Sequence, residues 1–246
     1  MKTEIERHML PRSTALGMTA AAALTVVAVA AVPAQADPQI FIGLQAPGVN
    51  GGAITMFAGP QGVGYGTFSH SNNIGQANPA DIPPTSTLPL LSGDTIDVTS
   101  VAGTLVVWMT ATGNLGANLP LGTQRFESSF RQNLLPDGWT VQVDTFLDPA
   151  DGIFTTAIPL SSHLFHAFDP TFDQTVRADP GSGFYSVTER FTISANGVVG
   201  STNTSADIAF VAPASVPAPI VGAGLPGLIL AGGGLLGWWR RRQKIV

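Results

Sequence analysis

The sequence predicts an all-β protein: a two-sheet antiparallel β-sandwich of jelly-roll or immunoglobulin-like topology, between an N-terminal signal helix and a C-terminal transmembrane helix. Two observations from the body of the chain support the prediction of a β-sandwich. Apolar residues alternate with polar ones, and Gly- and Pro-rich turn signals separate these stretches. The body also lacks a sustained apolar period of ~3.6 residues. Many short strands joined by such turns favour a sandwich over a barrel.

Alternation is clearest in three stretches. Trp139, Val141 and Val143 alternate with polar residues, and residues 125–131 and 185–193 follow the same pattern. Because successive side chains of a strand point to opposite faces, these stretches are predicted to be half-buried strands. Further strands are expected at Gln39 to Gln45, Ala53 to Ala58, Gly62 to Ser69, Thr95 to Val101, Thr104 to Ala111, Ile153 to Ile158 and Ile208 to Val211.

Turns and loops separate these strands. The best helical stretch of the body is short, Ser162 to Phe168, and Pro170 would stop it. Long polar loops are expected at Ser71 to Thr87 and at Thr112 to Leu121. The turn signals are Gly51-Gly52, Pro136-Asp137-Gly138, the run from Asp148 to Gly152, Asp179 to Gly181, and Asn196-Gly197.

Residues 1–36 have the order of a secretory signal peptide. Basic residues precede an apolar run from about Ala15 to Val32, and Ala34 and Ala36 then form an A-x-A cleavage site. We therefore expect the mature chain to begin at Asp37. The alternative is a first membrane-spanning helix, for which the run is short and rich in alanine.

The C-terminal region carries an uncharged stretch from Pro219 to Trp239, and we assign residues 220–239 to a transmembrane helix. At about 1.5 Å per helical residue, this stretch roughly matches a hydrocarbon core of ~30 Å. The basic tail 240–246 follows, with a stop-transfer cluster of Arg240, Arg241, Arg242 and Lys244. By the positive-inside rule this end would be cytoplasmic.

A short motif precedes that stretch. Residues 213–219 form a proline-rich tether that ends in Val216, Pro217, Ala218 and Pro219. This motif, one apolar helix and three arginines together resemble the PEP-CTERM sorting signal, although Ala218 replaces the family's glutamate. The resemblance implies cleavage by an exosortase-type membrane transpeptidase at the inner membrane. It also implies association with exopolysaccharide, biofilm or the cell surface; without cleavage, the segment would remain a membrane anchor.

The composition of the body, residues 37–212, excludes several functions. Four arginines and no lysine stand against fourteen acidic residues, a net charge of −10. Such a body repels nucleic acid, which is not expected as a partner. The chain contains no cysteine, so neither disulfides nor thiolate metal sites are available. About 176 residues are enough for one domain with a single core.

Glu127 and Glu189 are the only glutamates of the body, and each falls within a predicted strand. Two such carboxylates facing each other across a cleft would suit glycoside hydrolysis. The alternative is that Glu189 pairs with an arginine, such as Arg125 or Arg131, or lies near a sheet edge.

Other residues suggest metal or sugar binding, each with a simpler structural alternative. Asp144, Asp148 and Asp151 gather carboxylates around a turn, as a weak Ca²⁺ site would, although such residues are also ordinary turn formers. His163, His166 and Asp169 would share one face only if their segment were helical, so zinc is not expected. The glycines of GVGYG would allow a close approach to one strand face, and aromatic residues would stack on sugars or fill the core: Tyr65, Phe68, Trp108 and Trp139.

The sequence therefore predicts an exported bacterial surface or extracellular-matrix protein without catalytic residues and without a required cofactor. It would be sorted or anchored through its C-terminal signal, and would be membrane-anchored, at the cell surface or extracellular according to processing. A carbohydrate-binding module of the exopolysaccharide matrix is the alternative, and a β-sandwich glycoside hydrolase is a more distant one.

Overall fold

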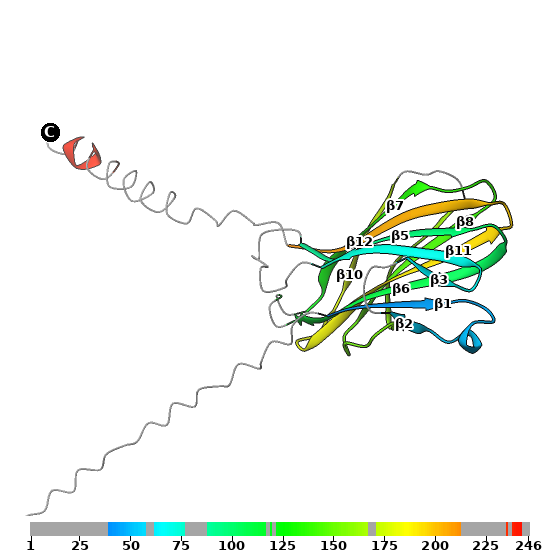
Figure 1. Cartoon of the computed structure of the whole chain (residues 1–246). Helices are drawn as coiled ribbons and strands as arrows, with labels where there is room; N and C mark the ends of the chain where they lie inside the picture. Colours follow the sequence, from blue (N-terminus) through cyan, green and yellow to red (C-terminus); the bar gives the residue numbers. More distant parts are fainter. Residues whose placement is uncertain are drawn as a thin grey trace, which may run out of the picture. The chain divides into compact units, whose positions relative to one another are not determined.

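The structure, a computed structural model, describes residues 39–57, 62–76, 88–116, 119, 122–166, 171–212, 235 and 238–242. Its strands form two six-stranded antiparallel sheets (Figure 1). In chain order the elements are β1 (Gln39–Gln45), the 3-10 turn η1 (Asn50–Gly52), β2 (Thr55–Phe57), β3 (Val63–Tyr65), β4 (Phe68–Gly75), β5 (Leu88–Thr99), β6 (Ala102–Leu115), β7 (Gln124–Leu134), β8 (Thr140–Asp148), β9 (Ile158–Phe165), β10 (Phe172–Ala178), β11 (Phe184–Asn196) and β12 (Gly200–Val211).

The strand order identifies the sandwich as a jelly roll. Sheet A has the order β2-β1-β6-β11-β8-β9, and sheet B has the order β10-β7-β12-β5-β4-β3. Strands β5 to β12 alone give β6-β11-β8-β9 facing β5-β12-β7-β10, which is the arrangement of an eight-stranded jelly roll. The two-sheet sandwich predicted from the sequence is confirmed. The hairpins β1–β2 and β3–β4 extend one sheet each.

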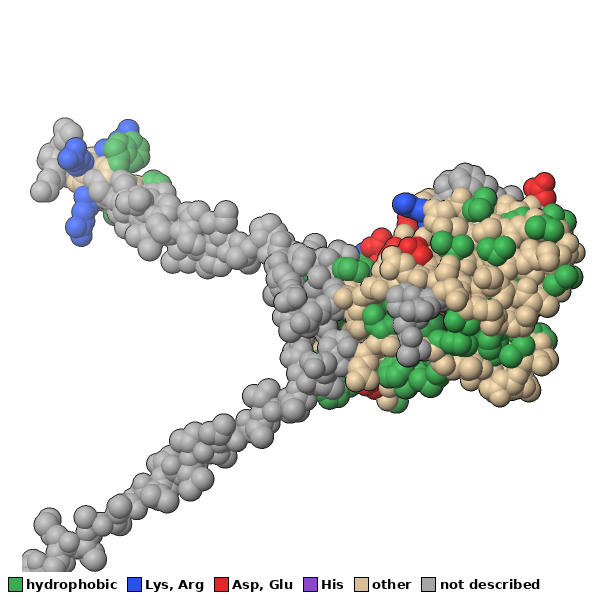
Figure 2. Space-filling view, viewed as in Figure 1, with side chains coloured by type: hydrophobic (Ala, Val, Ile, Leu, Met, Phe, Trp, Pro, Cys, Tyr) green, Lys and Arg blue, Asp and Glu red, His purple; other side chains and the backbone are tan. Residues whose placement is uncertain are grey.

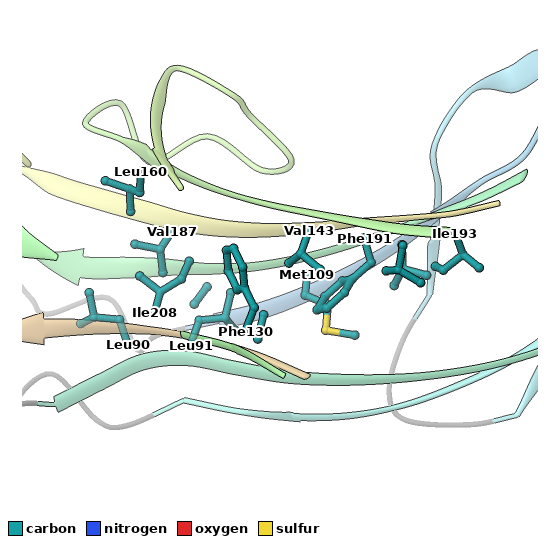
Figure 3. Packing of buried hydrophobic residues seen from close by; sticks show 14 of the residues in the cluster. Leu90, Leu91, Met109, Phe130, Val143, Leu160, Val187, Phe191, Ile193 and Ile208 are labelled. Atoms are coloured by element: carbon teal, nitrogen blue, oxygen red, sulfur yellow. The ribbon is translucent and has the colours of Figure 1, made fainter. Parts of the chain in front are cut away.

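The core lies between the sheets and consists of side chains from their inner faces. Figure 3 shows Val143, Val187 and Phe191 of sheet A directed toward the layer that holds Leu91 and Ile208 of sheet B. Aromatic rings tie the layers together, since Phe126 meets both Tyr185 and Phe210 edge-on at 6.4 Å. Such contacts each add about 0.5–1.5 kcal/mol beyond the burial of apolar area.

Polar side chains also line this interior, and most of them are paired. His70 Nδ1 lies 2.7 Å from Asp97 Oδ1, and both residues are almost completely buried. Between the sheets, the Ser128 hydroxyl on β7 and the Thr145 hydroxyl on β8 form a hydrogen bond of 2.7 Å. Pairing of this kind removes most of the penalty for burying a polar group.

Glu189 on β11 is the exception. Its side chain is completely buried between the sheets, and neither carboxylate oxygen has a hydrogen-bond partner. One oxygen lies so close to Gly93 of sheet B that a Cβ there would be only 2.4 Å away. Burial raises the pKa of Glu189 well above its ordinary value of 4.5, and the charges of Asp207 and Asp94 raise it further. Burial and these two charges therefore favour the neutral form of this carboxyl.

Three of the predicted strands and loops are wrong. The stretch Gly62 to Ser69 is a hairpin rather than one strand, because the chain turns between β3 and β4 at Gly66, whose φ is 61°. The predicted strand Ile153 to Ile158 is a loop up to its last residue, and β4 occupies the first part of the predicted loop Ser71 to Thr87.

The predicted short helix at Ser162 to Phe168 is also wrong. Residues up to Phe165 belong to β9, which pairs with β8 along the edge of sheet A. Strand pairing satisfies the backbone of this stretch, and Leu160 and Phe165 supply its buried apolar side chains. A short segment has too little helical propensity of its own to compete with such pairing.

The fold-class prediction also needs correction at its flanking helices. Within the residues the structure describes, no helix is long and apolar enough to cross a membrane, and no N-terminal signal helix is seen. Among the described residues outside the sandwich, Leu235 and 238–242 are helical. The signal segment 1–36 and most of 220–239 lie outside the described residues.

Replacing Glu189 with glutamine is expected to stabilise the protein at neutral pH. The pKa of Glu189 is raised in the folded protein, so its contribution to stability is fully present below pH 4.5. This contribution is lost as the pH rises, because Glu189 gives up its proton more readily in the unfolded chain than in the folded one. Glu189→Gln should therefore gain about 1–3 kcal/mol at pH 7 and nothing near pH 4. Urea denaturation of the full chain at pH values from 4 to 7 measures this change in the free energy of unfolding. Glu127→Gln is the control, and an equal gain in both variants would contradict the prediction.

Candidate functional site

The outer face of sheet A is partly covered by the chain itself. The loop 149–157, between β8 and β9, lies on it: the backbone N–H of Phe154 donates to Thr110 Oγ1 at 3.2 Å. The Ser186 hydroxyl donates to the carbonyl of Gly152 at 2.7 Å. Phe154 has a φ of 56°, a left-handed conformation that costs a non-glycine residue about 1 kcal/mol or more. The contacts with sheet A hold the loop in this shape.

Arg190 on β11 lies between two aromatic rings of this face. Its guanidinium carbon is 5.4 Å from the ring centroid of Trp108 on β6 and 5.1 Å from that of Phe146 on β8. Its Nε and one terminal nitrogen donate to Asp144 Oδ2 at 3.1 and 2.7 Å. The Arg190 side chain is 32% exposed and that of Asp144 9%. The guanidinium is therefore held in one orientation, balanced in charge, and open to solvent in part.

Hydrogen bonds extend this arrangement across the sheet. Asp144 Oδ1 accepts from the Gln142 amide at 3.0 Å and from the Ser162 hydroxyl at 2.8 Å. On the other side, the Trp108 indole N–H donates to Gln45 at 3.2 Å. The six side chains form one continuous row, here named the Arg190 row: Gln45, Trp108, Arg190, Asp144, Gln142 and Ser162.

The Arg190 row crosses five neighbouring strands, β1, β6, β11, β8 and β9. Four gaps of ~4.8 Å between strands give the row a length of about 19 Å. Charged side chains are sparse on the view of the sandwich in Figure 2, where tan polar and backbone atoms dominate; most of the visible acidic atoms gather in one place, and one more acidic side chain lies at the far end. In the row itself, the Arg190 charge is balanced by Asp144, and the side chains are held by hydrogen bonds.

The three aspartates predicted as a weak calcium site have separate roles. Asp144 belongs to the Arg190 row, whereas Asp148 accepts hydrogen bonds from the backbone of Ala150 and Gly152 at 2.9 and 3.1 Å. Burial tends to raise the pKa of Asp148, but these backbone hydrogen bonds hold it below its ordinary value of 3.8. Asp151 accepts from the Gly113 N–H, and its pKa is raised, chiefly by burial. No group of three or more metal-ligating side chains occurs in the part of the chain that the structure describes.

The two glutamates do not face each other. Glu189 lies between the sheets, whereas Glu127, opposite Thr175 on β10, belongs to the outer face of sheet B. Because sheet B separates them, they cannot act together on one glycosidic bond.

The histidines considered as possible metal ligands also have separate surroundings. His163 stacks on Phe172 with a centroid distance of 4.2 Å, and His166 is exposed. Asp169 lies outside the described residues. Since the segment is a strand, the helical spacing that would bring these groups to one face does not exist.

Three of the aromatic residues considered for sugar stacking, Tyr65, Phe68 and Trp139, belong to the core, whereas Trp108 packs against Phe154 on the outer face of sheet A. Trp139 is fully buried and Trp108 is 7% exposed, and Tyr65 and Phe68 are likewise buried. Between residues 39 and 212, no described aromatic side chain is among the exposed ones. In GVGYG, Gly62 is exposed just before the short edge strand β3, and Gly64 is exposed within it.

The sorting and processing residues fall almost entirely outside the described part. Ala34, Ala36, the motif Val216 to Pro219 and Lys244 lie there. Arg240, Arg241 and Arg242 are exposed and helical, and the guanidinium of Arg242 lies 4.2 Å from the ring centroid of Trp238.

Comparison with known proteins gives little guidance. No protein-family model and no curated protein matches the chain. Among solved structures, TmCBM61 in complex with β-1,4-galactotriose is similar with a TM-score of 0.30 and 10% identity, covering 59% of this chain and 88% of that one. TmCBM27, a carbohydrate-binding module described for specific mannan recognition, is similar with a TM-score of 0.28 and 8% identity. The similarity covers 58% of this chain and 86% of that one.

The enzymatically active domain of tailspike protein 4 from bacteriophage CBA120 gives a TM-score of 0.31 and 14% identity, with 59% of this chain covering 19% of that one. At these scores the likenesses carry no argument about the function of this chain.

Loss of Arg190 is expected to destabilise the domain. In Arg190→Ala the largely buried Asp144 loses its counter-ion and two rings lose their packing partner, so we expect a loss of about 1–3 kcal/mol. The matched control is Arg131→Ala, which removes an exposed arginine of sheet B and should change stability by about 0.5 kcal/mol or less. Urea denaturation of both variants measures the difference, and equal losses would show that the row contributes no specific stability.

Proposed function

We propose that the sandwich is a carbohydrate-binding domain and that the Arg190 row is its binding surface. The observation that supports this most is the alignment of donors and acceptors along one row about 19 Å long, in which Arg190, Gln142 and Ser162 reach solvent and the Arg190 charge is already balanced by Asp144. Sugar hydroxyl groups both donate and accept, and a neutral oligosaccharide would match such a row.

Preorganisation favours binding at this row. Gln142 and Ser162 are held by hydrogen bonds to Asp144, and Arg190 is held between two rings. Ordering a side chain on binding costs about 0.5–1.5 kcal/mol, and these side chains are already ordered. The exposed edge of the guanidinium and the Ser162 hydroxyl remain the groups nearest to solvent.

The role we propose is binding without catalysis. Glu127 and Glu189 lie on opposite sides of sheet B, so the body's glutamates form no acid and base pair. The row itself contains one carboxylate, that of Asp144, which is engaged by Arg190.

The binding test uses calorimetric titration of the full chain with neutral oligosaccharides. β-1,4-Galactotriose and mannan oligosaccharides, the sugars named for two of the similar structures, are the first probes. We expect one of these or a related neutral glycan to bind, and Gln142→Ala combined with Ser162→Ala to weaken binding tenfold or more while the domain stays folded.

Asn133→Ala combined with Ser205→Ala is the matched control on the outer face of sheet B, where Asn133 donates to Ser205 at 3.0 Å. Equal binding by both double variants would contradict the proposed surface. Recovery of shortened oligosaccharides from the titration would contradict a purely binding role.

We also propose that the protein is exported and sorted at the bacterial envelope. This rests on the signal-like segment 1–36 and on the resemblance of Val216 to Pro219 and the following residues to a PEP-CTERM signal. The processing enzyme would be an exosortase-type transpeptidase, and exopolysaccharide at the surface would provide a ligand.

Mass spectrometry of the protein from its native surface tests export and sorting. The expected chain begins at Asp37, because Ala34 and Ala36 form the cleavage site, and ends near Pro219. A chain that still begins at Met1 contradicts export through this signal, and one that ends at Val246 contradicts cleavage at the sorting motif.

A further inference from the structure

Two arginines stand directly opposite each other on the outer face of sheet B. Arg125 on β7 and Arg177 on β10 are register partners, and both are exposed. Directly opposed residues of an antiparallel pair have Cβ atoms about 4.5–5.5 Å apart on the same face. With Thr123, Gln124 and Val211 they line a hollow of about 90 Å³.

Among the described residues, neither of these arginines has a carboxylate partner. No hydrogen bond or ion pair to a described residue involves either guanidinium, although acidic residues outnumber arginines fourteen to four in residues 37–212. Like charges directly opposite each other are destabilising. Two of the body's four positive charges are thus placed together, at an energetic disadvantage, around one hollow.

The geometry suits one oxyanion. Each guanidinium carries five N–H donors in a planar fork that matches a carboxylate or phosphate. Two such forks beside one hollow can hold both oxygens of a single anionic group by charge-assisted hydrogen bonds. Binding would also remove the repulsion between the two cations.

The neighbouring positions restrict the ligand to one acidic group. Glu127 lies two residues from Arg125 on the same face, and Asp173, which accepts a hydrogen bond from Ser129, lies two positions further along that face. Asp207 is the register partner of Ser129 on the other side. These carboxylates repel a polyanion but accept hydrogen bonds from hydroxyl groups.

We propose that Arg125 and Arg177 form a second binding site, for the carboxylate of a singly acidic sugar such as glucuronate. Its hydroxyl groups would face the acidic positions next to the hollow. The site lies on sheet B, on the opposite side of the sandwich from the Arg190 row, and does not depend on the function proposed for that row.

The test is calorimetric titration of the full chain with sodium glucuronate, with glucose and with inorganic phosphate. We expect glucuronate to bind in the millimolar range and glucose at least tenfold more weakly, since the carboxylate supplies the charge-assisted bonds. Arg125→Ala and Arg177→Ala should each weaken glucuronate binding tenfold or more. Arg131→Ala removes the same charge from the same strand and face, and should change it by less than twofold.

Further outcomes decide the proposal. Arg177→Lys keeps the charge and serves as a milder variant if an alanine variant loses its fold; it should still weaken binding, because the planar fork is lost. Phosphate binding with the same arginine dependence, without glucuronate binding, would assign the site to a free phosphate and overturn the sugar acid. Absence of binding by either anion, or equal losses in the Arg131 variant, would overturn the site. Loss of neutral-glycan binding alone would affect only the Arg190 row.

Discussion

Polar side chains enclosed between two packed sheets need hydrogen-bond partners, because burying an unpaired polar group there destabilises the fold by more than its packing contacts stabilise it. The sandwich satisfies this requirement with His70 and Asp97 within sheet B, with Gln132 bonded to its neighbouring strand, and with the Ser128 to Thr145 bond between sheets. A slip of one residue in any strand would turn these groups to the opposite face. Hydrogen bonding in the interior therefore fixes the strand register together with apolar packing.

The alternation of β11 has a specific consequence for its two charged residues. Glu189 and Arg190 are adjacent in sequence, so a strand points them to opposite faces and they cannot pair. Arg190 finds Asp144 on the outer face, whereas both oxygens of Glu189 remain without a partner inside. The same rule that builds the Arg190 row thus leaves a buried carboxyl next to Gly93.

Strands in which apolar side chains alternate clearly over several residues could be predicted from the sequence. Residues 125–131 and 185–193 fall within β7 and β11, whereas the first part of β12 was missed because its inward residues are Thr202 and Thr204. The Arg190 row was missed for another reason. It joins Arg190 to Asp144, 46 positions away, and such pairs depend on strand register and order, which alternation does not encode.

The jelly-roll order also determines when the domain can become stable during folding. β5 and β12 pair in the middle of sheet B, where Thr99 stands opposite Gly200, so about a hundred residues must be closed into a loop before this ladder forms. Topologies dominated by such distant pairs fold slowly, in roughly milliseconds to seconds, because the entropy of loop closure is lost before the contacts compensate. A chain interrupted before β12 would leave β5 and β7 without their shared neighbour. The last strand of the sandwich is therefore the one that completes sheet B.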